Sequence, residues 1–237
     1  MVRRVAREIA CAVLDGLVSP RCPACGHEAD GLCAMCRARL MRPDAEGCWR
    51  CGEPTVPGSG RCIGDHRPLR GLAFRRSAFG YAGTGGALVR RFKFGGDGAA
   101  GIFLLRGVVA LARRQLSGWP RQTLVIPVPM HARKRRSRGF DQATRLAEGV
   151  GEALELPCGR RVLVRIRDTR PQGDPRTTSR EANVAGVFRV ARPRFLAGKH
   201  VLLVDDVTTS GATARECARV LRAAGARRVG LLTAASG

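Results

Sequence analysis

The sequence is poor in acidic and aromatic residues. Its 42 lysine and arginine residues stand against 19 aspartate and glutamate residues, so the formal net charge is +23. Nearly all of the positive charge is arginine, because the only lysines are Lys93, Lys134 and Lys199. A surplus of this size favours polyanionic partners such as nucleic acid or anionic lipid. Aromatic residues make up only 5% of the chain, which limits the platforms on which nucleic-acid bases stack.

Several familiar signatures are also missing. No apolar run reaches the length needed to cross a bilayer, so we predict no membrane span. No G-x-x-x-x-G-K-[ST] motif occurs, which argues against a P-loop nucleotide hydrolase. Residues 96–101 satisfy G-x-G-x-x-G, but no buried strand precedes them and no acidic residue lies between Asp97 and Asp141. We therefore reject a dinucleotide site there and expect a flexible segment leading into a helix over 102–116.

The N-terminal residues resemble a secretory signal only superficially. Arg3, Arg4 and Arg7 precede an apolar stretch, but Asp15 interrupts it and no small-residue cleavage site follows. Cysteines in metal-ligand spacing come directly afterwards. We expect an amphipathic helix over residues 1–20 and a cytoplasmic protein.

Cysteine is abundant, and most of it is spaced as metal ligands. Pairs of the C-x₂-C type followed by glycine are strong signals of zinc sites in intracellular proteins. The first predicted site comprises Cys22, Cys25, Cys33 and Cys36, the last two in a helix expected over 33–41. Four sulfur ligands leave no open position, so the metal would be structural. Because so small a segment has too little core to fold alone, the metal would supply folding energy.

A second site lacks one obvious ligand. Its three sulfurs belong to Cys48, Cys51 and Cys62. The fourth ligand is either Asp65, which keeps the spacing, or His66, which we prefer because imidazole is the better zinc ligand. Loose thiols are the alternative for this site. We thus predict a zinc-binding module over 21–70 with one or two structural zinc ions. The cysteines outside the site ligands, expected as small buried residues, are Cys11, Cys158 and Cys217.

A run near the C-terminus joins a buried strand, two acidic residues and a hydroxyl-rich loop to a helix start. Residues 201–204 are all apolar, as in parallel strands that are covered on both faces. A helix is predicted from Thr213, which forms a capping box with Glu216, and Gly225 ends the helix. With a second strand over 229–233, the segment forms a right-handed βαβ unit.

The loop of this unit has the composition of a phosphate site. It comprises Thr208, Thr209, Ser210, Gly211, Ala212 and Thr213. Hydroxyl groups and the backbone N–H groups of a helix start bind phosphate together. Asp205 and Asp206 lie at the carboxyl end of the strand, where open α/β sheets bind ligands. They suit a vicinal diol or a hydrated Mg²⁺. The alternative is an ordinary acidic strand end before a capped helix.

These motifs carry a resemblance to known families. Residues 201–213 resemble the phosphoribosyl pyrophosphate (PRPP) loop of type I phosphoribosyltransferases, with Ser210 where a second threonine is commoner. Residues 127–142 resemble the P-V-P-x-x-x-x-R-x-x-x-R-G-F-N-Q segment of the ComF family, with Asp141 in place of asparagine. The likeness continues at residues 170–172 and 180–188. With the zinc knuckles, it covers nearly the whole chain.

The resemblance implies an α/β fold for residues 71–237, a Rossmann-like parallel sheet of the type I phosphoribosyltransferase fold. It assigns Pro127, Val128 and Pro129 to the pyrophosphate loop, and residues 167–183 to a mobile loop that closes over the site. A long polar stretch between strands expected over 162–166 and 187–190 suits such a lid. The cations at the pyrophosphate would be Arg133 and Arg138, joined on closure by Arg170 and Arg180. Mg²⁺ would accompany PRPP.

ComF proteins of naturally competent bacteria are implicated in handling single-stranded DNA. The resemblance therefore implies a PRPP-binding protein that binds single-stranded DNA in DNA uptake or processing, with a DNA-uptake helicase or other competence proteins as partners. The alternative is an active phosphoribosyltransferase, in which Asp205 and Asp206 hold ribose and metal while arginines stabilise departing pyrophosphate. The expected DNA surface comprises residues 133–138 with Arg90, Arg91 and Lys93. Taken alone, residues 133–138 are either a solvated loop or a nucleic-acid patch.

Overall fold

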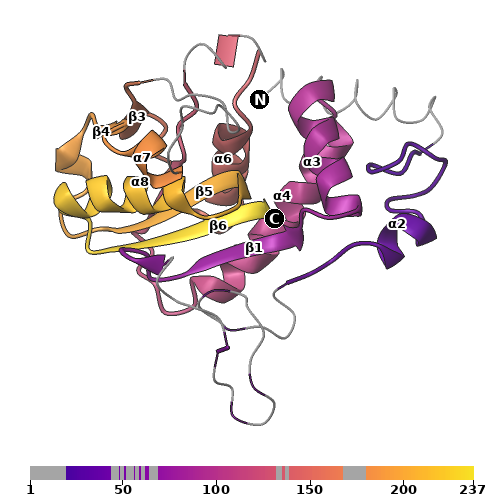
Figure 1. The fold of residues 1–237 in the computed structure, drawn as a ribbon, viewed down its shortest axis with the longest axis horizontal. Coiled ribbons are helices and arrows are strands. Elements are labelled where there is room, and N and C mark those ends of the chain that lie inside the picture. The colour runs from indigo at the N-terminus through magenta and orange to yellow at the C-terminus, as the bar shows by residue number, and fades with distance from the viewer. Residues whose placement is uncertain are drawn as a thin grey trace.

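The computed structural model describes residues 20–43, 69–131, 135–136, 139–167 and 180–237, together with residues 48, 51, 56, 59, 62 and 63. The predicted N-terminal helix, Cys11 and most of the predicted lid lie outside these ranges. Within them, a central parallel sheet carries helices on both faces (Figure 1). No helix of the described residues is both long and apolar enough to cross a membrane.

The central sheet has the strand order β1-β6-β5-β2. Its strands are β1 (Arg75–Gly80), β2 (Leu124–Pro127), β5 (His200–Thr208) and β6 (Arg228–Ser236). All neighbouring pairs are parallel. This sheet confirms the fold class that the sequence predicted, and it brings residues 75–80 next to the C-terminal strand of the chain.

Both faces of β5 are covered, as its apolar sequence predicts. Val201 and Leu203 belong to a core shared with α8 (Ala212–Ala223). Leu202 and Val204 belong to the opposite core, with residues of α4 (Gly98–Gln115) and α6 (Gln142–Leu154). All four strand residues are fully buried.

The remaining elements surround this sheet. They are α2 (Ala34–Ala38), α3 (Thr84–Gly95), β3 (Leu163–Arg165), α7 (Arg180–Val184), β4 (Phe188–Val190) and a 3₁₀ turn over Pro193–Phe195. Strands β3 and β4 pair antiparallel as a separate small sheet, at the positions where the sequence predicts strands. Helix α2 is shorter than the helix predicted over 33–41.

Helix α3 begins very close to the end of β1. A Cβ atom on Gly85 would lie 2.0 Å from the carbonyl oxygen of Gly80, and one on Gly86 would lie 2.3 Å from that of Tyr81. The two glycines therefore permit the sharp strand-to-helix connection. The Thr84 hydroxyl donates a hydrogen bond to the Cys36 carbonyl (2.8 Å), which attaches the N-terminal module to the start of α3 (Figure 1).

Two local predictions are wrong. Residues 98–101 are not a flexible segment, because α4 begins at Gly98 with Asp97 as its N-cap. The Asp97 carboxylate accepts the N–H of Ala100 (3.1 Å) and pairs with Arg91 (2.6 Å). The predicted capping box of α8 is also absent, because the N-cap residue is Gly211 in the left-handed region (φ 73°). Glu216 has other partners, described below.

Strand β5 is longer than predicted. The extra residues include Asp205 and Asp206, the acidic pair, and so determine where this pair lies. The prediction ended the strand at Val204, but pairing with β6 continues from Asp205 opposite Thr233 to Thr208 opposite Ser236. Strand β2 ends earlier, at Pro127 opposite Val204. Beyond that point β5 pairs with β6 alone among the described residues, so one side of β5 opens at Asp205.

Candidate functional site

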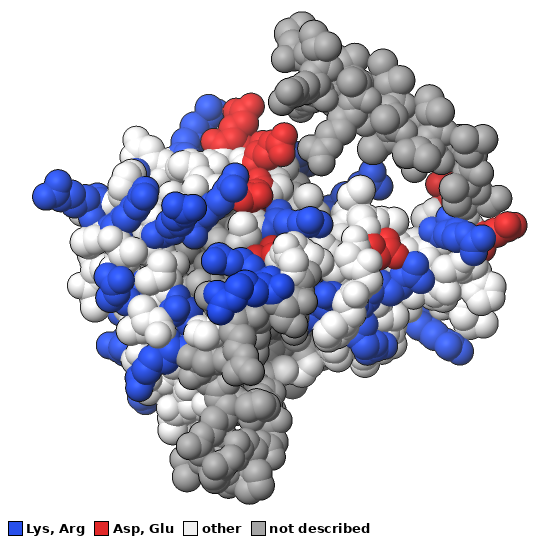
Figure 2. Space-filling view, turned by 90° about the horizontal axis from the view of Figure 1, so that it is seen from above, with Lys and Arg blue, Asp and Glu red and all other residues white. Residues whose placement is uncertain are grey.

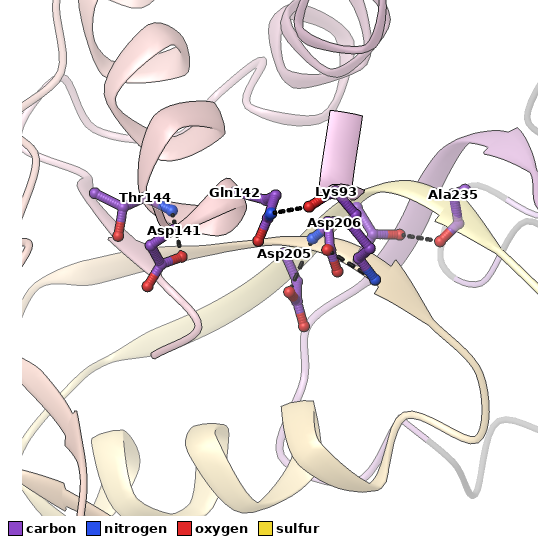
Figure 3. Close-up of polar contacts among 8 residues, drawn as sticks. Lys93, Asp141, Gln142, Thr144, Asp205, Asp206 and Ala235 are labelled. Atoms are coloured by element: carbon purple, nitrogen blue, oxygen red, sulfur yellow. Dashed lines mark hydrogen bonds and ion pairs between the residues drawn. The ribbon is translucent and has the colours of Figure 1, made fainter. Parts of the chain in front are cut away.

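The acidic pair lies at the carboxyl end of the sheet, and a lysine from α3 reaches it (Figure 3). The Nζ atom of Lys93 is 2.9 Å from Oδ2 of Asp206. The side chains are 20% and 13% exposed, so the ion pair is largely shielded from water. Asp205 accepts the backbone N–H of Asp206 through Oδ1 (2.8 Å). Lys93 is therefore not part of an open basic surface, contrary to the prediction.

The two carboxyl groups differ in their electrostatic surroundings. Burial raises the pKa of Asp205 well above its ordinary value, and the negative charge of Asp206 raises it further. The N–H of Asp206 and the charge of Lys93 oppose this rise. Two adjacent carboxylates resist simultaneous ionisation. Asp205 therefore carries a negative charge less readily than an isolated carboxylate does, whereas the carboxylate of Asp206 faces the ammonium group.

The segment that resembles R-G-F-N-Q joins α6 to the last turn of α3. Gln142 is fully buried and donates through Nε2 to the carbonyl oxygen of Lys93 (3.3 Å). The ring of Phe140 packs against Phe92, with centroids 5.7 Å apart. Asp141 is the N-cap of α6 and accepts the N–H of Thr144 (3.1 Å). Since aspartate and asparagine are about equally good N-caps, Asp141 fits a position where the family has asparagine.

The hydroxyl-rich loop leads from β5 into the N-terminus of α8. Arg75 and Arg215 donate to its backbone carbonyls, at Thr209 (3.5 Å) and Ser210 (2.7 Å) respectively. The Ser210 hydroxyl accepts the N–H of Ala212 (3.4 Å). Sequence reasoning missed these two arginines, because one lies in β1 and no local motif marks it. The loop thus has positive charge on both sides as well as a helix N-terminus, which suits a phosphate group.

The predicted pyrophosphate loop lies beside the acidic pair. Pro127 ends β2, and the N–H of Val128 donates to the carbonyl of Val204 (2.9 Å), one residue before Asp205. Val128 is buried and Pro129 is half-buried. The arginines predicted to bind the pyrophosphate cannot be placed. Arg133, Arg138 and Arg170 lie outside the described residues, as does the side chain of Arg180.

Glu216 connects α8 to the segment that follows the predicted lid. Its Oε1 accepts the N–H of Gly186 (2.8 Å), and Arg219 donates to both carboxylate oxygens (2.7 and 2.8 Å). These hydrogen bonds, chiefly those from Arg219, lower the pKa of Glu216 against the opposing effect of burial. Glu216 therefore holds the corner between α7 and β4 against α8.

We expect Glu216→Gln to lower the free energy of unfolding by about 1 kcal/mol near neutral pH, because the amide cannot pair with the partly exposed guanidinium. The folded-state pKa of Glu216 lies below its ordinary value of 4.5, so its contribution is complete above that pH and is lost as the pH falls through the folded-state pKa. Urea unfolding across this range measures the effect. Glu152→Gln, at an exposed position of α6, is the control. A pH-independent difference would contradict this role.

The cysteines form two clusters that suit metal. In the first, the sulfur atoms of Cys22, Cys25, Cys33 and Cys36 lie within 4.8 Å of one another, and those of Cys48, Cys51 and Cys62 form the second cluster by the same measure. Tetrahedral zinc places its sulfur ligands roughly 3.8 Å apart. The distances between Cys25 and Cys33 (3.7 Å) and between Cys51 and Cys62 (3.4 Å) are close to this value. Asp65 and His66 lie outside the described residues.

The first cluster cannot readily carry four thiolates without a cation. Burial raises the pKa of Cys22, but backbone N–H groups outweigh it and lower that pKa to about 6. Burial and the neighbouring sulfurs raise the pKa of Cys36 to about 12. A bound Zn²⁺ supplies the missing charge. Outside the clusters, Cys217 is fully buried as predicted, whereas Cys158 is only partly buried.

A basic groove follows α8. It encloses about 420 Å³, and its charged lining residues are Arg70, Arg215, Glu216, Arg219 and Arg222. Glu216, the single acid of this lining, is paired with Arg219. Ala212 at the first turn of α8 also lines the groove, which places one end of it at the hydroxyl-rich loop.

Two family models match the chain. The model of the phosphoribosyl transferase domain matches residues 137–237, and that of the double zinc ribbon domain matches residues 13–64. The parallel sheet and the cysteine clusters agree with both. The molecule is thus a protein of the phosphoribosyltransferase fold with a double zinc ribbon that binds structural zinc.

Similar proteins of known name identify the family more narrowly. The DNA utilization protein YhgH of Salmonella typhi is 32% identical over 206 residues, which cover 84% of this chain and 87% of the relative. The competence protein ComFC of Bacillus subtilis is 26% identical over 196 residues, covering 80% and 77%. The competence protein F of Haemophilus influenzae is 29% identical over 106 residues, covering 44% and 46%. The chain belongs to the ComF family, as the sequence motifs predicted.

Proposed function

We propose that the chain binds PRPP at the carboxyl edge of its sheet and acts in the handling of single-stranded DNA in the cytoplasm. One observation supports the ligand above all others. The acidic pair, the end of β2 and the N-terminus of α8 meet at a single open edge of the sheet. Such an edge offers carboxylates for a ribose diol and N–H groups for a phosphate, which are the two ends of a phosphoribosyl group.

Each part of PRPP has a matching part of this edge. The 5′-phosphate suits the loop of residues 208–213, where Arg75 and Arg215 contribute positive charge. The ribose hydroxyls suit Asp205 and Asp206. The pyrophosphate suits residues 127–129 at the end of β2, with cations of residues 133–138 alongside. Mg²⁺ would bind together with PRPP, coordinated by the pyrophosphate oxygens, since Mg²⁺ is commonly held by one or two carboxylates and substrate phosphates.

The DNA part of the proposal rests on the names of the relatives and on surface charge. The relatives are called DNA utilization and competence proteins. Figure 2 shows a face on which Lys and Arg side chains outnumber Asp and Glu. Because Arg91 pairs with Asp97 and Lys93 with Asp206, we move the expected DNA contact from these residues to the groove along α8. Arg90, Arg135 and Arg136, which are exposed, remain candidates. A helicase or other competence protein would be the partner.

A second candidate is an active phosphoribosyltransferase. The match of residues 137–237 to the transferase model favours it, because this region contains the acidic pair and the hydroxyl-rich loop. Release of pyrophosphate from PRPP in the presence of a free base or another nucleophile would establish this activity.

Filter binding of a labelled single-stranded oligonucleotide at several salt concentrations tests the DNA proposal. We expect a steep salt dependence, whose log-log slope decreases by about 0.7 for each DNA phosphate that the protein no longer neutralises. Replacing Arg70 and Arg222 by glutamate should flatten the slope and weaken binding at least about tenfold at low salt, because both residues line the groove. The matched control is the same charge reversal at Arg113 and Arg114, exposed on α4.

The outcomes separate the candidates. Absence of binding at low salt removes the DNA proposal. Equal effects of the two charge reversals would place the DNA elsewhere than the groove. Displacement of the oligonucleotide by stoichiometric PRPP would indicate that the arginines serve phosphate groups of PRPP instead.

A further inference from the structure

The cation beside the acidic pair is the ammonium group of Lys93. This group is 2.9 Å from Asp206, and neither side chain is more than 20% exposed. Removing one partner of a shielded ion pair leaves an uncompensated charge, which is strongly unfavourable. The contact is therefore a built feature of the site and not a chance pairing at the surface.

The core holds the backbone of Lys93 in this position. Its carbonyl oxygen accepts the hydrogen bond from Gln142, whose side chain is fully buried. Its neighbour Phe92 is 3% exposed and packs against the ring of Phe140. Both contacts join the last turn of α3 to the start of α6. The ammonium thus extends to the acidic pair from a helix end that is packed against α6.

The identity of the residue is informative in this chain. Arginine supplies nearly all the positive charge, and lysine occurs only at positions 93, 134 and 199. An ammonium is a compact, strongly hydrated point charge, whereas a guanidinium is a broad planar fork. The compact ion is the closer substitute for a small metal cation beside one carboxylate.

We propose that Lys93 is the resident cation of the acidic pair, and that its ammonium takes the place of a protein-bound divalent ion when a ribose phosphate binds. A divalent ion at Asp206 would have to displace Lys93 or lie beside it, and like charges at such distances repel strongly in a shielded site. Instead, Asp206 and the N–H donors of Lys93 together face the ligand. The inference rests on the proposed function for the identity of the ligand, but its cation part is testable without that ligand.

The first experiment measures Mn²⁺ binding to the zinc-loaded full chain by electron paramagnetic resonance. We expect the wild type to bind no Mn²⁺ at the acidic pair, and Lys93→Met to bind it at least about tenfold more tightly than the wild type. Adding Asp206→Asn to Lys93→Met should abolish that binding. Lys199→Met is the matched control, and Lys93→Gln replaces Lys93→Met if the latter fails to fold.

The inference is overturned if the wild type binds one Mn²⁺ that Asp206→Asn removes. It is overturned equally if the Lys93 variants gain no affinity for Mn²⁺, because the position would then not be a cation site.

The second experiment measures ribose 5-phosphate binding by calorimetry in metal-depleted buffer and with added Mg²⁺. This probe lacks the pyrophosphate that would itself carry Mg²⁺, and depleting the buffer avoids a chelator that would strip the zinc. The wild type should bind equally, within about twofold, in both buffers. Lys93→Met should bind at least about tenfold more weakly without Mg²⁺ and regain affinity with it. Wild-type binding that requires Mg²⁺ overturns the inference and leaves the proposed function standing. Failure to bind ribose 5-phosphate and PRPP in either buffer overturns the proposed function, and Mn²⁺ binding then decides the role of Lys93.

Discussion

Replacing Cys25 by serine is expected to unfold the zinc-binding module and to release the first metal ion. Cys25 supplies one of the four clustered sulfurs, and no described segment of the module offers a large core that would hold it together without metal. Zinc contributes on the order of 10 kcal/mol to the folding of modules of this kind. Elemental analysis should give up to two zinc ions per wild-type chain and one fewer in the variant. Limited proteolysis should then cleave the variant within residues 20–43.

The central sheet should survive this change, because most residues of its two cores belong to the strands and to α3, α4, α6 and α8, and the module adds only the buried residues Cys22, Ala24 and Leu32 to one of them. The module is joined to the start of α3 by the hydrogen bond between Cys36 and Thr84, and to β1 by those that Gly80 donates to Met41 and Arg76 donates to Cys48, so we expect a disturbance limited to these two elements. Cys158→Ser, outside both clusters, is the control and should keep all zinc. A zinc-free wild-type protein would contradict the metal assignment.

The fourth ligand of the second site has its own test. His66→Ala should release only the second ion, because imidazole is the better zinc ligand of the two candidates. Release of that ion by Asp65→Ala instead would show that the preference for His66 is wrong.

Replacing both Asp205 and Asp206 by asparagine should weaken PRPP binding more than tenfold, which corresponds to more than about 1.4 kcal/mol. Asparagine keeps the size of the side chain but removes the negative charge that faces the ribose hydroxyls. It also leaves Lys93 without its carboxylate partner, so the ammonium would no longer be held at the ligand. Calorimetry with PRPP and Mg²⁺ measures the weakening.

Asp97→Asn is the matched control for this double replacement. It also removes a carboxylate that pairs with a cation, Arg91, but asparagine still caps α4 and the position lies outside the acidic pair. The control should bind PRPP like the wild type. If the wild type and the double variant are equally indifferent to PRPP, the edge is a relic of the fold and not a ligand site.

Local sequence patterns predicted much of the fold because they describe neighbours along the chain. The apolar run of residues 201–204 is a strand buried on both faces, and Gly225 follows the end of α8 with φ of 98°. The cysteine spacing predicts both clusters, since ligands a few residues apart can reach one metal ion. The same reasoning failed where a side chain can form either a local hydrogen bond or hydrogen bonds with other partners. The sequence spacing of Glu216 suits a capping box, but in the structure its carboxylate accepts hydrogen bonds from Gly186 and Arg219 instead.

The sequence by itself determined the fold class, the cysteine clusters and the position of the acidic pair along the chain. These depend on periodicity, spacing and motif order, which are properties of short segments. Only the tertiary structure decided what surrounds the acidic pair. Lys93 reaches Asp206 because β1 pairs with β6, which places α3, the helix after β1, near the carboxyl end of β5. At that end β5 extends beyond the last residue of β2. Gln142 supports that lysine through a buried hydrogen bond between elements far apart in sequence. Such contacts depend on strand order and register, which no local pattern encodes.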